Sequence, residues 1–108
     1  MAPQESYIQW GWNLLAIIIS DGILAKLRDK HDVSRAEVEQ CFQNRCGMFL
    51  RDNREDHRTD PPSLWFIAET NKGRLLKVVC MFVDGNIHIK SVFEPNDDEI
   101  RLYEAQGK

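Results

Sequence analysis

Polar turn residues divide the second half of the chain into three apolar runs of strand length. The runs are residues 64–70, 74–83 and 87–93. Gly73 ends the first connection between them, and Asp84-Gly85 lies in the second. Such residues supply the positive φ that tight hairpins need. The pattern therefore predicts one antiparallel meander, and the middle run, which is apolar on both faces, would be its central strand.

The chain before the meander carries helical spacing instead. Ile23 and Leu27 lie four residues apart, on the apolar stripe of a first helix. Ser34 and Glu37 have the spacing of a capping box, so a second helix is expected to begin directly after Ser34. A strand over residues 48–51 would follow, short enough to lie at a sheet edge.

A third helix is expected near the C-terminal end. Asp97, Asp98 and Glu99 follow Pro95 closely, and acidic side chains stabilise the positive end of the helix dipole. Tyr103 would be one of its inward positions. The predicted fold is therefore α+β, with two N-terminal helices, a four-stranded mainly antiparallel sheet and a C-terminal helix.

Residues 1–18 are apolar, and we expect them to be an N-terminal extension of a single domain over residues 19–108. Their apolar core is roughly half the ~20 residues that a transmembrane helix needs, and no basic segment of a signal peptide precedes it. The stretch would pack on the domain as an added helix or strand; a shallow anchor on a membrane surface is the lesser alternative, and no membrane partner is expected. Trp10 and Trp12 also make it a candidate homodimer interface.

Composition narrows the function classes. The 108 residues suffice for one core, and a net charge of −3 argues against broad nonspecific binding of nucleic acid. Cys41, Cys46 and Cys80 form no Cys-x-x-Cys pair, so we expect reduced thiols in a cytoplasmic protein. The carboxylates around His57 match no defined metal-binding loop, and neither a metal nor a cofactor is expected.

One charged residue interrupts the central run of the meander. Lys77 is its only internal charge, and a lysine there must reach water, a carboxylate or a ligand. In the following run, strict alternation would divide the side chains between one face (Ile87, Ile89, Ser91 and Phe93) and the other (His88, Lys90 and Val92). Lys77 and Lys90 would then lie on neighbouring strands, where they can share a face.

Several short motifs, taken in order, resemble one protein family. They are Lys30-His31-x-Val33-Ser34 with Glu37 and Phe42, Asp52 with His57, Gly73-Arg74, Ile87-x-Ile89-x-Ser91, and Glu99 with Tyr103. Over residues 20–104 the arrangement resembles the BrnT family of bacterial toxins. The resemblance implies a RelE-like fold and a metal-independent ribonuclease that blocks translation. It also implies a cognate antitoxin, a protein that neutralises the toxin and binds operator DNA.

Metal-independent RNA cleavage needs a proton acceptor, a proton donor and cations that stabilise the charge on phosphorus. His57 suits the acid–base role because imidazole titrates near neutrality, and Lys77 and Arg54 complete the candidate catalytic set. The candidate substrate-binding residues are Arg58, Arg74, His88, Lys90 and Trp65, of which the arginines suit phosphate and the tryptophan a base.

Each of these residues also has an ordinary structural interpretation. Arginines and acids alternate over residues 51–60, so this loop can equally be a solvated network of ion pairs. Trp65 at strand spacing is more often a core residue, and His31 suits the C-terminal end of a helix. Phe93 stands where the family usually has arginine, and the last helix is acidic where the family's is rich in arginine. These departures favour the alternative, a non-catalytic binding module of the same fold that acts through protein–protein contacts or homo-oligomerisation.

Overall fold

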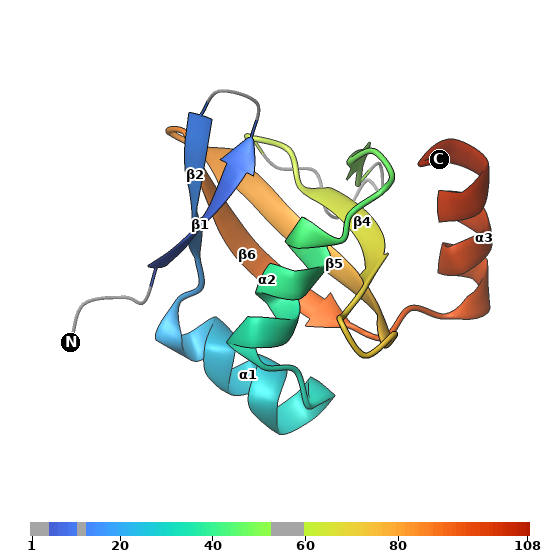
Figure 1. The fold of residues 1–108 in the computed structure, drawn as a ribbon, viewed down its shortest axis with the longest axis horizontal. Coiled ribbons are helices and arrows are strands. Elements are labelled where there is room, and N and C mark those ends of the chain that lie inside the picture. The colour runs from blue at the N-terminus through green and yellow to red at the C-terminus, as the bar shows by residue number, and fades with distance from the viewer. Residues whose placement is uncertain (1–4, 11–12, 53–59) are drawn as a thin grey trace.

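The computed structural model describes residues 5–10, 13–52 and 60–108, and within them the chain forms six strands and three helices. In chain order these are β1 (Glu5–Trp10), β2 (Asn13–Ile18), α1 (Asp21–His31), α2 (Arg35–Gln43), β3 (Leu50–Arg51), β4 (Leu64–Glu69), β5 (Leu75–Val83), β6 (Asn86–Phe93) and α3 (Asp97–Gln106). The α+β class, the three helices and the meander β4–β5–β6 match the expectations from the sequence (Figure 1).

The sheet is larger than expected, with six described strands in the order β1-β2-β6-β5-β4-β3. The sequence predicts four strands and leaves residues 1–18 as an added helix or strand. Within this stretch β1 and β2 instead pair with each other, and β2 joins β6 in parallel, with Ala16 opposite Asn86 and Ile18 opposite His88. All the other neighbouring strands are antiparallel. The sheet is therefore mixed, and the N-terminal stretch contributes strands to it.

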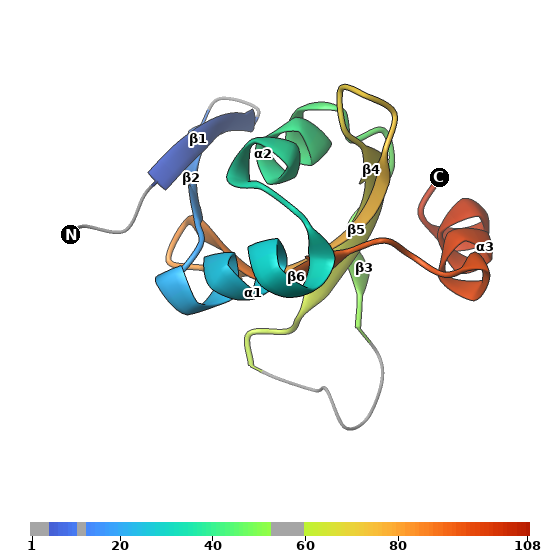
Figure 2. The ribbon, with the colours of Figure 1, turned by 90° about the horizontal axis from the view of Figure 1, so that it is seen from below.

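Helices cover both faces of this sheet. Figure 2 shows α1 and α2 on the concave side of the curved sheet and α3 on the other side. Neighbouring residues of β4 point to these two faces, as strand geometry requires. The Phe66 ring lies 4.9 Å from that of Phe42 in α2, whereas the Trp65 ring lies 5.6 Å from that of Tyr103 in α3. The main core lies between the sheet and α1 and α2.

The predicted start signals of two helices are confirmed. Ser34 and Glu37 form the expected capping box at α2, and Asn96 and Glu99 form a second one at α3. The last turn of α3 is held at Met48, whose N–H donates to the Gly107 carbonyl over 2.7 Å. None of the described helices is long and apolar enough to span a bilayer.

A β-bulge in β6 corrects the expected division of its faces. Val79 pairs with Ser91 but the next residue, Cys80, pairs with Ile89, so Lys90 is left between two paired residues. An extra residue reverses the alternation beyond it. Ile89 and Val92 are both buried in the core, so the expectation that Ile89 and Ser91 share a face is wrong.

Candidate functional site

Charged and aromatic side chains meet in a recess between α3 and the sheet. We call it the α3 recess; its volume is about 580 Å³, and its main lining residues are Arg51, Asp52, Trp65, Lys77, Glu99 and Leu102. They come from the edge strand β3, the inner strands β4 and β5, and α3. Two cations, an aromatic ring and three carboxylates, with Asp98 as the third, thus share one cleft.

Lys77 lies at the inner end of the recess, with only 8% of its surface exposed. It stands opposite Ile67 of β4 and Phe93 of β6, so its side chain shares a face with both. The ammonium Nζ lies 2.5 Å from Glu99 Oε2 and 4.5 Å from the centre of the Trp65 ring. A buried ammonium needs a counter-ion, and the Glu99 carboxylate provides it. Glu99 is therefore the partner that the sequence predicted for this lysine.

The Glu99 carboxylate serves two partners at once. Its Oε1 accepts a hydrogen bond from the Asn96 N–H at 2.9 Å, which caps α3, while Oε2 accepts one from Lys77. The beginning of α3 is therefore tied to the centre of the sheet through one side chain. A ligand that breaks the ion pair between Lys77 and Glu99 also removes one of the contacts that hold α3 on the sheet.

Arg51 is a candidate that the sequence reasoning missed. It is exposed, lines the α3 recess and makes no ion pair within the part of the chain that the structure describes. The next residue, Asp52, donates its N–H to the Ser63 carbonyl over 2.9 Å, which closes the base of the connection between β3 and β4. Only the position of Arg51 beside Asp52, one of the motif residues, could have drawn attention to it.

The structure brings together two of the eight predicted site residues, Lys77 and Trp65. Trp65 is 6% exposed, and its ring contacts Lys77 and Tyr103, so a base would have to displace one of these to stack on it. Three predicted residues, Arg54, His57 and Arg58, lie outside the described residues. The roles of these residues stay predictions.

Arg74, a predicted substrate-binding residue, is engaged inside the protein. Its guanidinium donates to Glu37 Oε2 at 3.1 Å, to Glu94 Oε1 at 3.0 Å, and to the backbone carbonyls of His31 and Asp32 at 2.9 and 2.6 Å. Burial works to lower the pKa of Arg74, but the hydrogen bonds and charges of the two carboxylates outweigh it and raise the pKa. Arg74 therefore links the end of α1 and the start of α2 to the sheet.

The same contacts shift the pKa of the Glu37 carboxyl. Burial works to raise the pKa of Glu37, but hydrogen bonds from the Ser34 backbone and from Arg74 outweigh that effect, and the pKa is lowered. The ionised carboxylate is thus the form that the native structure stabilises.

The two remaining predicted residues, His88 and Lys90, lie away from Lys77. Lys90 Nζ donates to Ser63 Oγ at 2.7 Å, and His88 sits between Ile18 of β2 and Met81 of β5. The structure therefore does not join these side chains to Lys77 in one cluster, and their role in binding stays a prediction.

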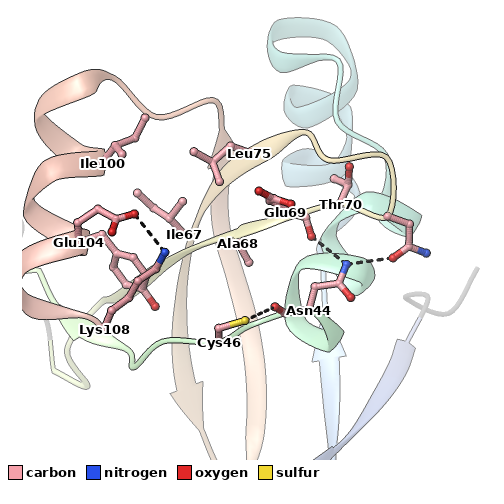
Figure 3. Close-up of a pocket in the computed structure, with 12 residues that line it drawn as sticks. Asn44, Cys46, Ile67, Ala68, Glu69, Thr70, Leu75, Ile100, Glu104 and Lys108 are labelled. Carbon is pink, nitrogen blue, oxygen red and sulfur yellow. Dashed lines mark hydrogen bonds and ion pairs between the residues drawn. The ribbon is translucent and has the colours of Figure 1, made fainter.

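A second recess, of about 510 Å³, lies along the other flank of α3 and is lined by Ile67, Leu75 and Ile100 among others (Figure 3). Polar groups at its rim bond to one another: Asn44 Nδ2 donates to the Glu69 carbonyl at 2.9 Å, and Lys108 Nζ donates to Glu104 Oε1 at 3.1 Å. It contains none of the predicted site residues, and Lys108 and Glu104 at its rim pair with each other. We therefore place the candidate chemistry in the α3 recess.

Thiol and metal chemistry find little support among the described residues. Burial raises the pKa of Cys41 and that of Cys80 to about 12, so both remain thiols at neutral pH, and only Cys46 is exposed. In residues 5–10, 13–52 and 60–108, no group of three His, Cys, Asp or Glu side chains is arranged to hold a metal ion.

Comparison with known proteins leaves the α3 recess to be interpreted from its own geometry. The chain matches no model of a protein family, no curated protein and no solved structure.

Proposed function

We propose that the protein is a BrnT-like toxin of a type II toxin–antitoxin pair, a metal-independent ribonuclease that inhibits translation. One observation carries the proposal: the two cations Arg51 and Lys77 line the same recess. Asp52 lies beside them, and the sequence directly after Asp52 carries Arg54 and His57. Cations and an imidazole close together in sequence or space are the parts that such a reaction needs.

Each part has a role in the proposed cleavage. His57 would accept the proton of the ribose 2′-hydroxyl, whose oxygen attacks the adjacent phosphorus. Arg51 and Arg54 would hold the phosphate oxygens, because a guanidinium offers paired donors to two oxygens. The 5′-oxygen leaves with a proton, and the product ends in a 2′,3′-cyclic phosphate. The imidazolium formed in the first step can return that proton.

The Lys77–Glu99 pair limits this mechanism. A phosphate reaches the ammonium only by competing with Glu99, whose carboxylate lies 2.5 Å away. Arg51 makes no ion pair with another described residue, so among these residues it is the recess cation that a phosphate reaches without displacing a partner. In this proposal, Arg51 contacts the phosphate directly, and Lys77 stabilises the site without contacting the phosphate.

The engagement of the predicted cations favours one second candidate function. Lys77, Arg74 and Lys90 all bond to protein groups, and α3 is acidic, with Asp97 and Asp98 exposed at its start. Such a surface suits a protein partner better than RNA. The second candidate is a non-catalytic binding module of the same fold.

Induced expression in bacterial cells separates the two functions. The comparison includes the intact protein, His57→Ala, Arg51→Ala and the control Lys72→Ala, which removes an exposed cation of the β4–β5 turn, outside the α3 recess. The toxin proposal expects growth arrest by the intact protein and by the control, and normal growth with the other two. Arrest should also be relieved by co-expression of a small antitoxin protein.

The melting temperature of each purified variant, followed by circular dichroism, shows whether it folds. Normal growth with all four folded, soluble proteins would refute the toxin and leave the binding module. Equal arrest by all four would refute the assignment of the site to Arg51 and His57.

A further inference from the structure

The second recess, on the other flank of α3, has an apolar wall with a carboxylate at each end. The wall comprises Ile67 of β4, Leu75 of β5 and Ile100 of α3. Figure 3 shows Glu104 of α3 on one side and Glu69, the last residue of β4, on the other, with Ile67 and Leu75 between them. A volume of about 510 Å³ suits a small organic ligand.

The periodicity of each element explains this arrangement. Side chains two residues apart in a strand share a face, so Ile67 and Glu69 both lie on the α3 side of the sheet. Side chains four residues apart in a helix are neighbours, so Ile100 and Glu104 both line the recess. The strand and the helix thus each contribute one apolar side chain and one carboxylate.

The charges of the recess favour a cationic ligand. Its charged lining residues are Glu69, Glu104 and Lys108, so carboxylates outnumber ammonium groups. The Glu69 side chain is exposed and makes no ion pair with another residue that the structure describes. Near Glu69, the Thr70 hydroxyl already accepts a hydrogen bond from the backbone N–H of Arg74 at 3.1 Å. At this end of the wall, a ligand therefore finds its partner in the Glu69 carboxylate.

Lys108 shows how a primary ammonium is held at the other end of the wall. Its Nζ lies 3.1 Å from Glu104 Oε1, and the two side chains are 50% and 59% exposed. An ion pair as exposed as this contributes little to stability. The ammonium of a ligand can therefore replace that of Lys108 beside Glu104 at small cost.

We propose that the second recess binds a free linear polyamine, whose methylene chain lies along the apolar wall. One terminal ammonium pairs with Glu69, and the other pairs with Glu104 in place of Lys108. A chain that is charged at both ends and apolar between them is complementary to this wall. Its buried methylene groups add an attraction that an inorganic cation lacks, and a monoamine can pair with only one of the two carboxylates.

The polyamine site is separate from the α3 recess. The two recesses have no lining residue in common, and they lie on opposite flanks of α3. Binding of a polyamine therefore goes beyond the proposed ribonuclease function, and it can be measured without any assay of RNA cleavage.

Nuclear magnetic resonance titration of the full chain with putrescine, a diamine, tests the proposal. We expect amide shifts around Glu69 and Glu104, and binding about 5-fold tighter than that of butylamine, which has the same carbon chain and one ammonium. Glu69→Gln and Glu104→Gln should each weaken putrescine binding about 5-fold, because each removes one ion pair. The matched control is Asp97→Asn, which removes an exposed carboxylate of α3 outside both recesses and should bind normally.

Lys108→Met provides a second test, with the opposite sign. It removes the ammonium that competes for Glu104, so putrescine should bind about 2-fold more tightly. Its control is Arg101→Met, which removes an exposed cation of the same helix that does not line this recess and should leave the affinity unchanged. Circular dichroism of each variant confirms that it is folded.

Three results would overturn the proposal. The first is the absence of amide shifts at the second recess on addition of putrescine. The second is equal affinity of Glu69→Gln, Glu104→Gln and Asp97→Asn, with Lys108→Met equal to Arg101→Met, since binding would then be nonspecific attraction of cations. The third is butylamine binding as tightly as putrescine, which would assign the recess to a lysine side chain of a protein partner instead.

Discussion

Replacing Arg74 with alanine tests whether this residue is a structural link. The change removes hydrogen bonds to two carboxylates and two backbone carbonyls. The pair with Glu94 contributes little, because the Glu94 side chain is 66% exposed. The bond to Glu37 and the two carbonyl bonds are shielded more, since the Arg74 and Glu37 side chains are each 25% exposed.

The expected cost follows from those three shielded bonds. Each contributes about 1 kcal/mol to the free energy of unfolding, so Arg74→Ala should lower it by about 3 kcal/mol. For a domain of this size the melting temperature should fall by about 12 °C. Arg74→Lys should recover only part of the loss, because one ammonium cannot reach all four partners.

Thermal melts followed by circular dichroism measure this effect, and Arg28→Ala is the matched control. Arg28 also pairs with a carboxylate, that of Asp29, but the two side chains are 71% and 65% exposed, so its melting temperature should not change. Equal melting temperatures for Arg74→Ala and Arg28→Ala would refute the structural role of Arg74. Substrate binding would then be the better explanation of that residue.

Two further predictions rest on the pKa shifts. The lowered pKa of Glu37 stabilises the folded protein at pH values above the unfolded pKa of about 4.3, and this stability is lost as the pH falls through the lower pKa of the folded state. Acidification over this pH range should therefore destabilise Arg74→Ala less than it destabilises the intact protein. Alkylation of the folded protein should label Cys46 alone, because Cys41 and Cys80 are buried thiols with a pKa of about 12. Rapid labelling of either buried thiol, detected by mass spectrometry, would contradict this packing.

Local signals explain why the sequence predicted much of the fold. Positive φ values at Gly73, Asp84 and Gly85 occur in the expected hairpins, and the capping box of Ser34 begins the expected helix. These features depend on residues within a few positions of each other, so they can be read from the chain. The central position of β5 also followed from its apolar character on both faces.

Features that depend on distant partners were harder to predict. The pairing of β2 with β6 joins residues about seventy positions apart, and the apolar stretch before Ile19 carries no pattern that distinguishes a strand from a helix. The bulge at Lys90 depends on how β6 meets β5, and the composition of β6 does not reveal it.

The candidate site was predicted in part for the same reason. A lone lysine in a central strand indicated that Lys77 needs a partner, but only the structure identifies Glu99 as that partner. Arg51 came to attention only through the recess that it lines. Arg74 was associated with substrate through a motif, although its contacts lie within the fold.

Cleavage of RNA by the purified protein in the presence of a chelator tests the central claim most directly. The account predicts that the intact protein and Lys72→Ala produce fragments ending in 2′,3′-cyclic phosphate, and that Arg51→Ala cleaves about 100-fold more slowly because it lacks a phosphate contact. Absence of cleavage by the folded, intact protein, or an equal rate with Arg51→Ala, would contradict it.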